Sequence, residues 1–475
     1  MSAGLVFPVL VAFSNGEDAI AVHLALIAFL GLFVTLLVLA AIRGRPRRVN
    51  NASSLLAAVL IWIAASIYGA LPFAIAGDYS LLTSLFESVS GVTTTGASAI
   101  TVRSAPASLL LWRAELEWLG GFLTLACIIH ILAPSGIGGI PQSGGRFFHT
   151  RGDHAGETEV ARFYGLLAQY TLVTIIFAAV FVATGNKPLI AIDLAMTAIS
   201  TGGYLPFDGS LSAHTSVATQ VFLAIALLLG AASLLWQRVV LTDVRRVASA
   251  GFEALVILAV VGVLTIVYAV RLQVLSGGSA GHSPLLALHE GFFAAASLVS
   301  TSGLETRAGV LQIIPELVVL FVVLAGASVF STAGGIKLFR IGAMLVQSQR
   351  ELALLIYPNS VGASRYFGSE QSRRSIRSVW TVFIVAMFIV AAGAFLLSVE
   401  GTGFEAGLTG SIAFFANAGP VYSALKPLAG STEIWPTIAE LGTAGKITAI
   451  ALMLLGRLEI MVILAILNLN YWIRR

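Results

Sequence analysis

Charged side chains are scarce in this chain: Asp, Glu, Lys and Arg make up 11% of its 475 residues, whereas 57% of the residues are hydrophobic. The mean hydropathy of +0.94 lies far outside the range of soluble domains. The single cysteine, Cys127, excludes disulfides within the chain and metal sites built from several thiolates. This composition indicates a protein embedded in membrane lipid.

The sequence also lacks the residues of a catalytic centre. No nucleophile stands beside a base, and the seven histidines are scattered without metal-ligand spacing. A polytopic membrane enzyme is therefore disfavoured, and we expect no catalytic residue and no organic cofactor on this chain. The net charge of +4 is small and needs no nucleic acid to explain it. We also find no cleavage site that would indicate a removed signal peptide.

Apolar runs long enough to cross a bilayer, which takes about 20 residues, recur along the whole chain. The apolar segment Leu5–Phe13 is too short to span and predicts only a partial first helix. The runs lie at roughly 19–42, 53–76, 107–132, 165–184, 216–239, 252–270, 310–330, 378–398 and 444–472. The sequence therefore predicts an all-α polytopic membrane protein.

Lysine and arginine are distributed unevenly between the loops. When the loops are assigned alternately to the two sides, 19 of the 27 Lys and Arg residues fall on one side and 7 on the other, with Arg457 inside a span. The richer side is cytoplasmic by the positive-inside rule. This assignment predicts a multi-pass membrane protein with a cytoplasmic C-terminus.

Four short segments recur at roughly hundred-residue spacing, each with a glycine turn after a buried-looking helix. They are Thr93–Ser98 (TTTGAS), Ser200–Tyr204 (STGGY), Ser300–Leu304 (STSGL) and Asn417–Pro420 (NAGP). Aligned on Gly96, Gly202, Gly303 and Gly419, they are 106, 101 and 116 residues apart. Glycine fits such turns because it adopts backbone conformations that a Cβ disfavours.

Each turn follows an apolar segment of about 10–15 residues that is too short to span. These segments are Leu81–Val92, Leu189–Ile199, Leu285–Val299 and Gly403–Ala416. We interpret them as re-entrant pore helices between two spanning helices. The predicted organisation is 1–50 for N-terminal extra helices, then four membrane–pore–membrane repeats at 51–150, 151–250, 251–375 and 376–475 around a pseudo-fourfold pore.

Non-helical backbone survives at membrane depth only where protein or water surrounds it, so the four turns should line a cavity. A ring of backbone carbonyls at the negative ends of four helices suits a dehydrated cation. The turns fall toward the extracellular face, so this predicts an outward-facing selectivity filter. Its predicted residues are Thr94, Thr95, Gly96, Ser200, Thr201, Gly202, Thr301, Ser302, Gly303, Asn417, Ala418 and Gly419.

An ion-coupled secondary carrier would also contain broken helices at the membrane midplane. Carriers usually show two halves, whereas this chain shows four quarters of one polarity, which favours a channel-like pore. A carrier that couples the transported cation to protons or Na⁺ (a symporter) stays open as the alternative, as does a Na⁺-permeable pore. Acidic residues of the pore segments, among them Glu87, Asp193 and Glu290, are interpreted either as anchors of helix starts or as a negative outer funnel.

Two features below the turns concern gating. The segment Ser331, Thr332, Ala333, Gly334 and Gly335 weakens the predicted helix Val310–Phe330 at its end, and taken alone it fits a kink with close packing. Arg457 lies within the last span, where a charge faces a bundle interior or water. A structural ion pair is one interpretation of Arg457. Glu459 is a poor partner because residues two apart on a helix point away from each other.

Several of these strings resemble the Trk/Ktr/HKT superfamily of potassium transporters, and the Trk branch with its TrkH-type uptake subunit most closely. They are Phe86–Ser98, Trp118–Gly121 (WLGG), Ser200–Tyr204, Ser331–Lys337 (STAGGIK) and Leu454–Glu459 (LLGRLE). The resemblance implies four pore repeats in one polypeptide, K⁺ as the transported ion and a homodimer. It also implies a cytosolic TrkA-type regulatory subunit that binds a nucleotide (NAD, ATP or ADP).

The resemblance further implies roles for the two features below the turns. The segment Ser331–Gly335 would be an intramembrane loop that blocks the path, and Arg457 would be a pore-facing charge beside it. Glycine in all four turns goes with K⁺ preference in the superfamily, and Gly96 fits that pattern. Ser302, Glu305 and Glu117 depart from it.

Overall fold

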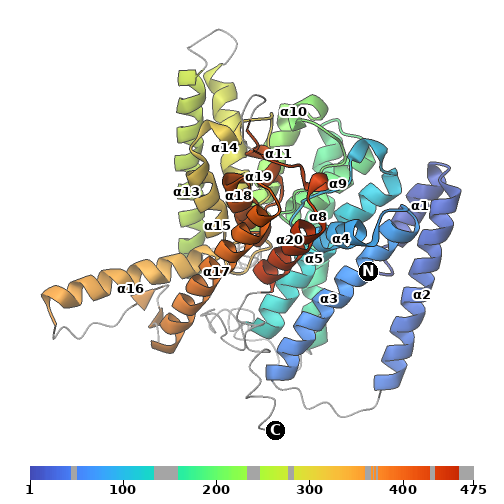
Figure 1. Ribbon diagram of the computed structural model, residues 1–475, viewed down its shortest axis with the longest axis horizontal. Helices are drawn as coiled ribbons and strands as arrows, with labels where there is room; N and C mark the ends of the chain where they lie inside the picture. The colour runs from blue at the N-terminus through green and yellow to red at the C-terminus, as the bar shows by residue number, and fades with distance from the viewer. Residues whose placement is uncertain are drawn as a thin grey trace.

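The computed structural model describes residues 1–43, 51–132, 159–232, 247–275, 283–358, 365–366, 369–370, 373–427 and 434–458. Nearly all of the regular structure in these residues is helical, as the sequence predicts (Figure 1). The exception is a two-residue antiparallel pair, β1 (Arg365–Tyr366) with β2 (Ser369–Glu370).

Two N-terminal helices precede four successive groups of helices. The N-terminal pair is α1 (Val6–Ser14) and α2 (Asp18–Ile42). The first group has α3 (Asn51–Ile75), α4 (Leu81–Val92) and α5 (Ala107–Cys127), which continues as the π-helical turn Ile128–Leu132. The second has α8 (Glu159–Ala183), α9 (Pro188–Ile199), α10 (Leu211–His214) and α11 (Val217–Ala231).

The third and fourth groups repeat this order. The third has α13 (Val247–Leu275), α14 (Pro284–Val299), α15 (Glu316–Ala325) and α16 (Leu338–Ile356). The fourth has α17 (Arg373–Val399), α18 (Phe404–Phe415), α19 (Pro420–Ala424) and α20 (Thr443–Arg457). In every group the short second helix packs against the long first one. The short helices α4, α9, α14 and α18 match the four predicted pore segments to within one residue at each end.

Local signals fix where the short helices begin. Ser80 and Ser283 accept hydrogen bonds from the N–H groups of Thr83 and Leu286, which are otherwise unpaired at a helix start. Proline at the first position opens α9 and α14, where its missing N–H costs nothing. The helix starts are therefore encoded in the sequence next to them.

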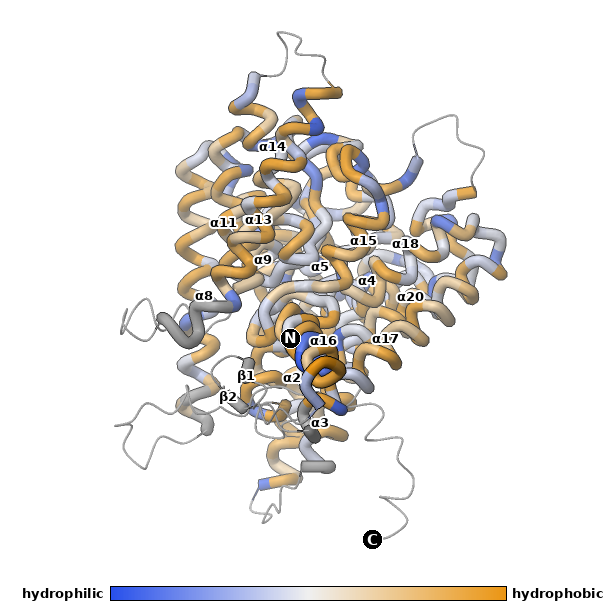
Figure 2. The backbone as a smooth tube through the Cα atoms, turned by 90° about the vertical axis from the view of Figure 1, so that its left-hand side faces the viewer, coloured by the Kyte–Doolittle hydropathy of each residue, from blue (hydrophilic) through white to orange (hydrophobic). Residues whose placement is uncertain are grey.

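The apolar core lies between the short helices and the helices around them. Phe86, Phe293 and Phe414 of three pore helices are fully or almost fully buried. The long outer helices instead expose leucine, isoleucine and phenylalanine, as expected for lipid-facing surfaces (Figure 2). Six helices among the described residues are long and apolar enough to span a membrane.

Three predicted spans differ from the helices that form. The third group's second helix is α15, of 10 residues, rather than the predicted Val310–Phe330. It ends at Gly326, whose φ of 65° directs the chain out of the helix. Helices α11 and α20 also have 15 residues each, and the remainder of their predicted runs lies outside the described residues.

Three of the seven Lys and Arg residues counted on the outer side lie within α-helices and not in loops. They are Arg113 in α5, Arg271 in α13 and Lys446 in α20. Arg113 is also buried, with 3% of its surface exposed. Most of the basic loops that determine the predicted orientation, including 144–158, lie outside the described residues.

Candidate functional site

The four glycine turns have one common backbone conformation. Thr94, Thr201, Thr301 and Asn417 have φ between 54° and 61°, in the left-handed region that non-glycine residues rarely adopt. The N–H of each bonds a carbonyl three residues back, at the carboxyl end of a short helix. The same strained turn therefore ends α4, α9, α14 and α18.

This conformation changes the alignment of the second turn by one residue. Counting two residues on from the left-handed position gives Gly96, Gly203, Gly303 and Gly419. Gly203, and not Gly202, is therefore the structural equivalent of Gly96. The sequence alignment chose Gly202 because two adjacent glycines are indistinguishable without the backbone angles. Below, the four turns are Thr94–Gly96, Thr201–Gly203, Thr301–Gly303 and Asn417–Gly419.

The four turns form a closed ring in space. A Cβ added to Gly96 would collide with the backbone of Gly203, and one added to Gly203 would lie 3.0 Å from the Ser302 carbonyl of the third turn. A Cβ on Gly303 would collide with Val421, just after the fourth turn. A Cβ on Gly419 would lie 2.5 Å from the backbone N of Ala97 in the first turn's continuation. The Gly419 N–H also donates to the carbonyl of Thr95 at 2.7 Å. Segments more than 300 residues apart thus meet around one axis.

A buried carboxylate supports the second turn from behind. Glu117 of α5 is fully buried, and its Oε1 accepts hydrogen bonds from the N–H groups of Gly203 (2.9 Å) and Tyr204 (3.2 Å). A Cβ on Gly202 would occupy the position of the Glu117 carboxylate. Gly202 therefore serves a different purpose from Gly203: it leaves room for this support.

A second polar cluster ties the first turn to the second. Arg113 donates to the Ser98 hydroxyl (3.0 Å) and to the Leu205 carbonyl (2.9 Å), and its guanidinium lies 4.3 Å from the ring centroid of Tyr204. The Tyr204 hydroxyl in turn donates to Glu87 at 3.1 Å. Sequence reasoning missed these supporting roles. A charge inside a spanning helix is the signal that could have found Arg113 and Glu117.

Two acidic residues of the short helices hold the chain that follows a turn. Glu87 accepts from the backbone of Ala99 (2.6 Å) and Ile100 (3.0 Å), just after the first turn. Glu290 forms an ion pair with Arg307 at 2.7 Å, just after the third turn. These contacts match neither sequence interpretation, because the two carboxylates are bonded to the segments after the turns and not to helix starts.

A cavity of about 470 Å³ lies on the side where the chain leaves the four turns. Gly96, Gly203, Gly303 and Gly419 all line it. The carboxylate of Glu305 also lines it and accepts from the Leu311 N–H at 2.8 Å. Burial raises the pKa of Glu305 to about 7, although hydrogen bonds from the backbone of Leu311 and Gly309 oppose that rise. This group therefore changes charge near neutral pH.

On the opposite side of the ring, the glycine-rich loop Gly326–Lys337 joins α15 to α16. Thr332 lies against the second turn, because its hydroxyl is 3.1 Å from both the Ile199 and Gly230 carbonyls. Gly334 lies against the third turn, since its N–H donates to the Thr301 hydroxyl at 2.8 Å. The structure thus places the predicted segment Ser331–Gly335 directly beneath the ring.

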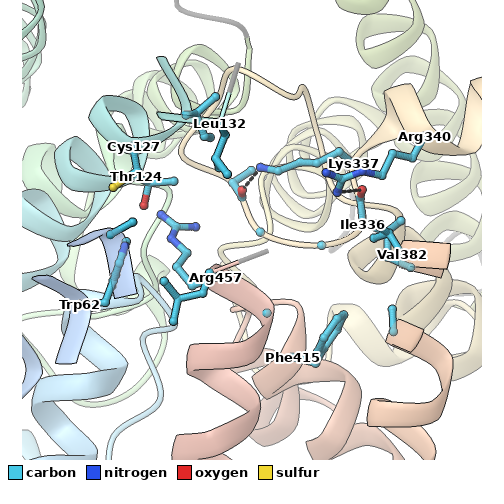
Figure 3. Close-up of a pocket in the computed structure, with 18 residues that line it drawn as sticks. Trp62, Thr124, Cys127, Leu132, Ile336, Lys337, Arg340, Val382, Phe415 and Arg457 are labelled. Atoms are coloured by element: carbon cyan, nitrogen blue, oxygen red, sulfur yellow. Dashed lines mark hydrogen bonds between the residues drawn. The ribbon is translucent and has the colours of Figure 1, made fainter. Parts of the chain in front are cut away.

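Arg457 lies beside this loop. Its Nη1 donates to the Thr332 carbonyl at 2.7 Å, and 7% of its surface is exposed. Its Nε and Nη2 have no hydrogen-bond partner among the described residues. Arg457 lines a small cavity with Gly334, Gly335 and Cys127, and Figure 3 shows it between the loop and the α5 side chains. The described part of the chain provides no carboxylate partner for this guanidinium.

Two more cations, Lys337 and Arg340, line this cavity. Lys337 donates to the Ala333 carbonyl, and Arg340 donates to the Ile336 carbonyl at 3.0 Å (Figure 3). Both bonds run along the chain by four residues and fix the start of α16. The structure therefore brings together all of the turn and loop residues that the sequence singled out. Their roles in ion passage remain proposals.

No family model matches the chain, but individual relatives do. The Trk system potassium uptake protein TrkI of Halomonas elongata is 28% identical over 427 residues, covering 87% of this chain and 82% of that protein. The Trk system potassium uptake protein TrkH of Salmonella typhimurium is 27% identical over 466 residues, covering 94% and 92%. The TrkH protein of Escherichia coli is 26% identical over 446 residues, covering 90% and 88%.

The crystal structure of the potassium transporter TrkH from Vibrio parahaemolyticus has the same fold. It superposes with a TM-score of 0.83 and covers 99% of this chain and 96% of that one, at 24% identity. The fold class that the sequence predicted is thus confirmed. In sequence and in fold alike, the chain resembles the TrkH-type proteins of the Trk/Ktr/HKT superfamily, which are transporters and not enzymes.

Proposed function

We propose that this chain is the membrane subunit of a potassium uptake system and conducts K⁺ through the ring of four turns. The observation that carries the proposal is the ring itself: four equivalent strained turns, each at the carboxyl end of a buried short helix, meet around one axis. The relatives named as potassium uptake proteins support K⁺ as the transported ion.

The ring suits a cation for two physical reasons. The carboxyl end of a helix carries roughly half a negative charge, and four such ends converge on the turns. The left-handed residue and the glycine two positions later let successive carbonyls point toward the axis, where they replace the water around a dehydrated ion. The turns at Gly96 and Gly303 both show this pairing of positive φ values.

We propose that the glycine-rich loop and Arg457 together block the passage of ions. The loop Gly326–Lys337 lies directly beneath the ring, so a cation that leaves the turns meets Thr332 and Gly334 first. The buried guanidinium of Arg457 repels a cation at the same level. Displacement of the loop would then open the path.

The proposal includes the orientation of the chain in the membrane. We place the cavity next to Glu305 outside the cell and the C-terminus in the cytoplasm, and we assign the chain to a bacterial inner membrane.

The proposal also includes the partners of the chain. Helix α16 leaves the body of the protein (Figure 1) and exposes Leu345, Leu352 and Leu355. This unpaired apolar surface supports contact with a second copy in a homodimer or with a cytosolic TrkA-type subunit that senses NAD, ATP or ADP.

A proton- or sodium-coupled carrier is the second candidate. Glu305 favours it, because a carboxyl group whose pKa is about 7 can bind and release a proton in the cavity above the turns. Coupling would make K⁺ uptake depend on the pH gradient as well as on the K⁺ gradient. A passive pore would not show this dependence.

Reconstitution of the purified protein in liposomes tests both candidates. Liposomes loaded with KCl and diluted into a K⁺-free sorbitol buffer should accumulate ⁸⁶Rb⁺, and protein-free liposomes should not. A pH gradient imposed by changing the internal pH alone, at fixed external pH and membrane potential, distinguishes the two candidates, because only a coupled carrier changes its uptake. Absence of uptake, with and without a cytosolic regulatory subunit, would contradict the proposed function.

A further inference from the structure

The glycine-rich loop is hydrogen-bonded to the turns themselves and not merely placed under them. The Thr201 hydroxyl shares its hydrogen between the Ser200 carbonyl of its own turn (2.7 Å) and the Thr332 hydroxyl (3.1 Å), so a loop side chain contacts a side chain of the second turn. The Thr301 hydroxyl of the third turn accepts from the Gly334 N–H at 2.8 Å. Thr201 and Thr301 are the left-handed residues of their turns. The loop therefore holds equivalent positions in two of the four turns.

Thr332 is the centre of this connection. Its hydroxyl accepts from Thr201 and has the Ile199 and Gly230 carbonyls as acceptors for its own hydrogen. Its N–H donates to the Gly230 carbonyl at 3.3 Å, and its carbonyl accepts from Arg457 at 2.7 Å. One residue thus joins the second turn, helix α11 and the last spanning helix.

Gly334 brings the loop against the fourth turn as well. A Cβ added to Gly334 would collide with the Ala416 carbonyl, the residue before the left-handed Asn417. Asn417 is held separately, since its side-chain amide donates to Thr95 and to the Met453 carbonyl, at 3.0 Å each. The contacts of the loop are therefore unequal around the ring: hydrogen bonds to the second and third turns, and close packing under the fourth.

The two ends of the loop are fixed elsewhere. Glu253 of α13 accepts from the Ser328 hydroxyl (2.7 Å) and from the Val329 N–H (3.2 Å). At the other end, the Leu338 N–H donates to the Ala327 carbonyl at 3.0 Å. A displacement of the loop would therefore concentrate in its middle, where Thr332 and Gly334 hold the turns.

We propose that Thr332 is a specificity-determining residue that couples the loop to the ion preference of the turns. This inference rests on the proposed function. In the observed position, the loop engages the hydroxyls of Thr201 and Thr301 from below, so that neither is free to turn toward the axis. When the middle of the loop moves away, both hydroxyls become available as additional oxygen ligands for a dehydrated monovalent cation. Opening the path and sharpening the preference for K⁺ are then one event.

The test replaces Thr332 by valine, which has the same shape but no hydroxyl. Thr332→Val removes the hydrogen bond of the loop to the Thr201 hydroxyl and leaves that hydroxyl with the Ser200 carbonyl alone. The lone pairs of its oxygen are then open to the ion, so the ratio of ⁸⁶Rb⁺ to ²²Na⁺ uptake should rise about 3- to 10-fold, as expected for a change of one or two buried hydrogen bonds. Thr332→Ser keeps the hydroxyl and should keep the wild-type ratio. The matched control is Thr265→Val in α13, because the Thr265 hydroxyl bonds only the Val261 carbonyl of its own helix.

A double-mutant cycle shows whether the effect passes through the second turn. In a Thr201→Val background, Thr332→Val should no longer change the uptake ratio. Persistence of the full effect in that background would overturn the proposal, as would an unchanged ratio in Thr332→Val at wild-type abundance. If Thr332→Val does not reach the membrane, Thr332→Ala provides the same measurement with a smaller side chain.

The readouts separate this inference from the proposed function. If wild-type protein takes up neither ⁸⁶Rb⁺ nor ²²Na⁺, the proposed function has failed. If wild-type protein takes up ⁸⁶Rb⁺ and Thr332→Val changes only the rate, the proposed function holds. In that case the loop only blocks the path, and the proposed coupling between the loop and the ion preference of the turns is wrong.

Discussion

Gly96 and Gly203 face each other so closely that neither the first nor the second turn leaves room for a Cβ at Gly96. The two residues are far apart in sequence, and they occupy the same position in the first and second turns. Gly96 has a φ of 71°, which a side chain also disfavours. Steric contact and backbone angle therefore both require glycine here, and they do so at the centre of the proposed filter.

Replacement of Gly96 by serine should therefore reduce discrimination between K⁺ and Na⁺. The strain of a left-handed residue with a Cβ is on the order of 1–2 kcal/mol, and the collision with Gly203 adds to it. Competing ⁸⁶Rb⁺ and ²²Na⁺ uptake measures the effect. Gly262→Ser in α13 is the control, because nothing lies within 4 Å of a Cβ there. Wild-type selectivity in Gly96→Ser would refute the assignment of the turns as a filter.

Replacement of Gly334 by alanine should displace the loop and raise the rate of uptake. The added Cβ collides with the Ala416 carbonyl, which belongs to the rigid end of α18. The loop must then move down, away from the ring. ⁸⁶Rb⁺ uptake per molecule should rise several-fold and depend less on a regulatory subunit. Gly165→Ala in α8, where a Cβ has open space, should have no such effect. A slower rate at equal abundance would show that the loop supports the ring instead of blocking the path.

Replacement of Arg457 by glutamine should raise the maximal rate and leave the extracellular apparent affinity for K⁺ nearly unchanged. At about 6 Å and an effective dielectric constant near 20, a guanidinium and a K⁺ ion repel each other by about 3 kcal/mol. Even a third of this energy changes passage several-fold. Concentration-dependent ⁸⁶Rb⁺ uptake separates rate from affinity. Reduced membrane abundance without faster uptake per molecule would instead indicate a structural role for Arg457 through its hydrogen bond to the Thr332 carbonyl.

Uptake should depend on pH through Glu305. Its pKa of about 7 means that the carboxyl group is mostly neutral at pH 6 and mostly charged at pH 8. The charged form attracts cations into the cavity above the turns, so the apparent affinity for K⁺ should improve as pH rises through 7. Glu305→Gln should flatten the pH profile of ⁸⁶Rb⁺ uptake between pH 6 and 8. A profile unchanged by this substitution would assign the titration to another group.

The same group affects stability with the opposite trend. The pKa of Glu305 in the folded protein is raised above its usual 4.5, so the folded state binds the proton more tightly than the unfolded state does. Its contribution to stability is therefore complete below about pH 4.5 and is lost as pH rises through 7. Thermal unfolding temperatures of Glu305→Gln should fall less than those of wild type over this interval.

Removal of the Glu117 carboxylate should loosen the second turn. Glu117→Ala leaves the buried N–H groups of Gly203 and Tyr204 without their acceptor, at a cost of about 1–3 kcal/mol for each donor. A lower unfolding temperature and a lower ⁸⁶Rb⁺/²²Na⁺ uptake ratio should result. Glu117→Gln keeps one oxygen acceptor and should be milder. The exposed Glu405 of α18 provides the matched control, Glu405→Ala, and equal effects of the two alanine variants would contradict this role.

The short helices show how far sequence reasoning extends. Their positions followed from their length, their apolar character and the glycine turns after them, and α4, α9, α14 and α18 agree with the prediction to within one residue at each end. These signals act within a few residues of the chain. The predicted helix end at Phe330 was wrong, because α15 already ends at Gly326. The sequence around Gly326 allows a helix to end or to continue there, and the contacts of the following loop with the rest of the protein determine that it ends.

The sequence by itself determined that this protein lies in a membrane, that it contains four short apolar helices followed by glycine turns, and which family it resembles. Hydrophobicity, helix caps and glycine conformation are properties of neighbouring residues, so a linear reading contains them. Only the tertiary structure decided that Gly203 rather than Gly202 completes the ring, that Glu117 and Arg113 support the turns, and that Thr332 bonds Thr201. Each of these depends on contacts between segments tens to hundreds of residues apart. Such contacts are fixed when the helices pack, because burial of a polar group is tolerated only where a partner from another segment satisfies it.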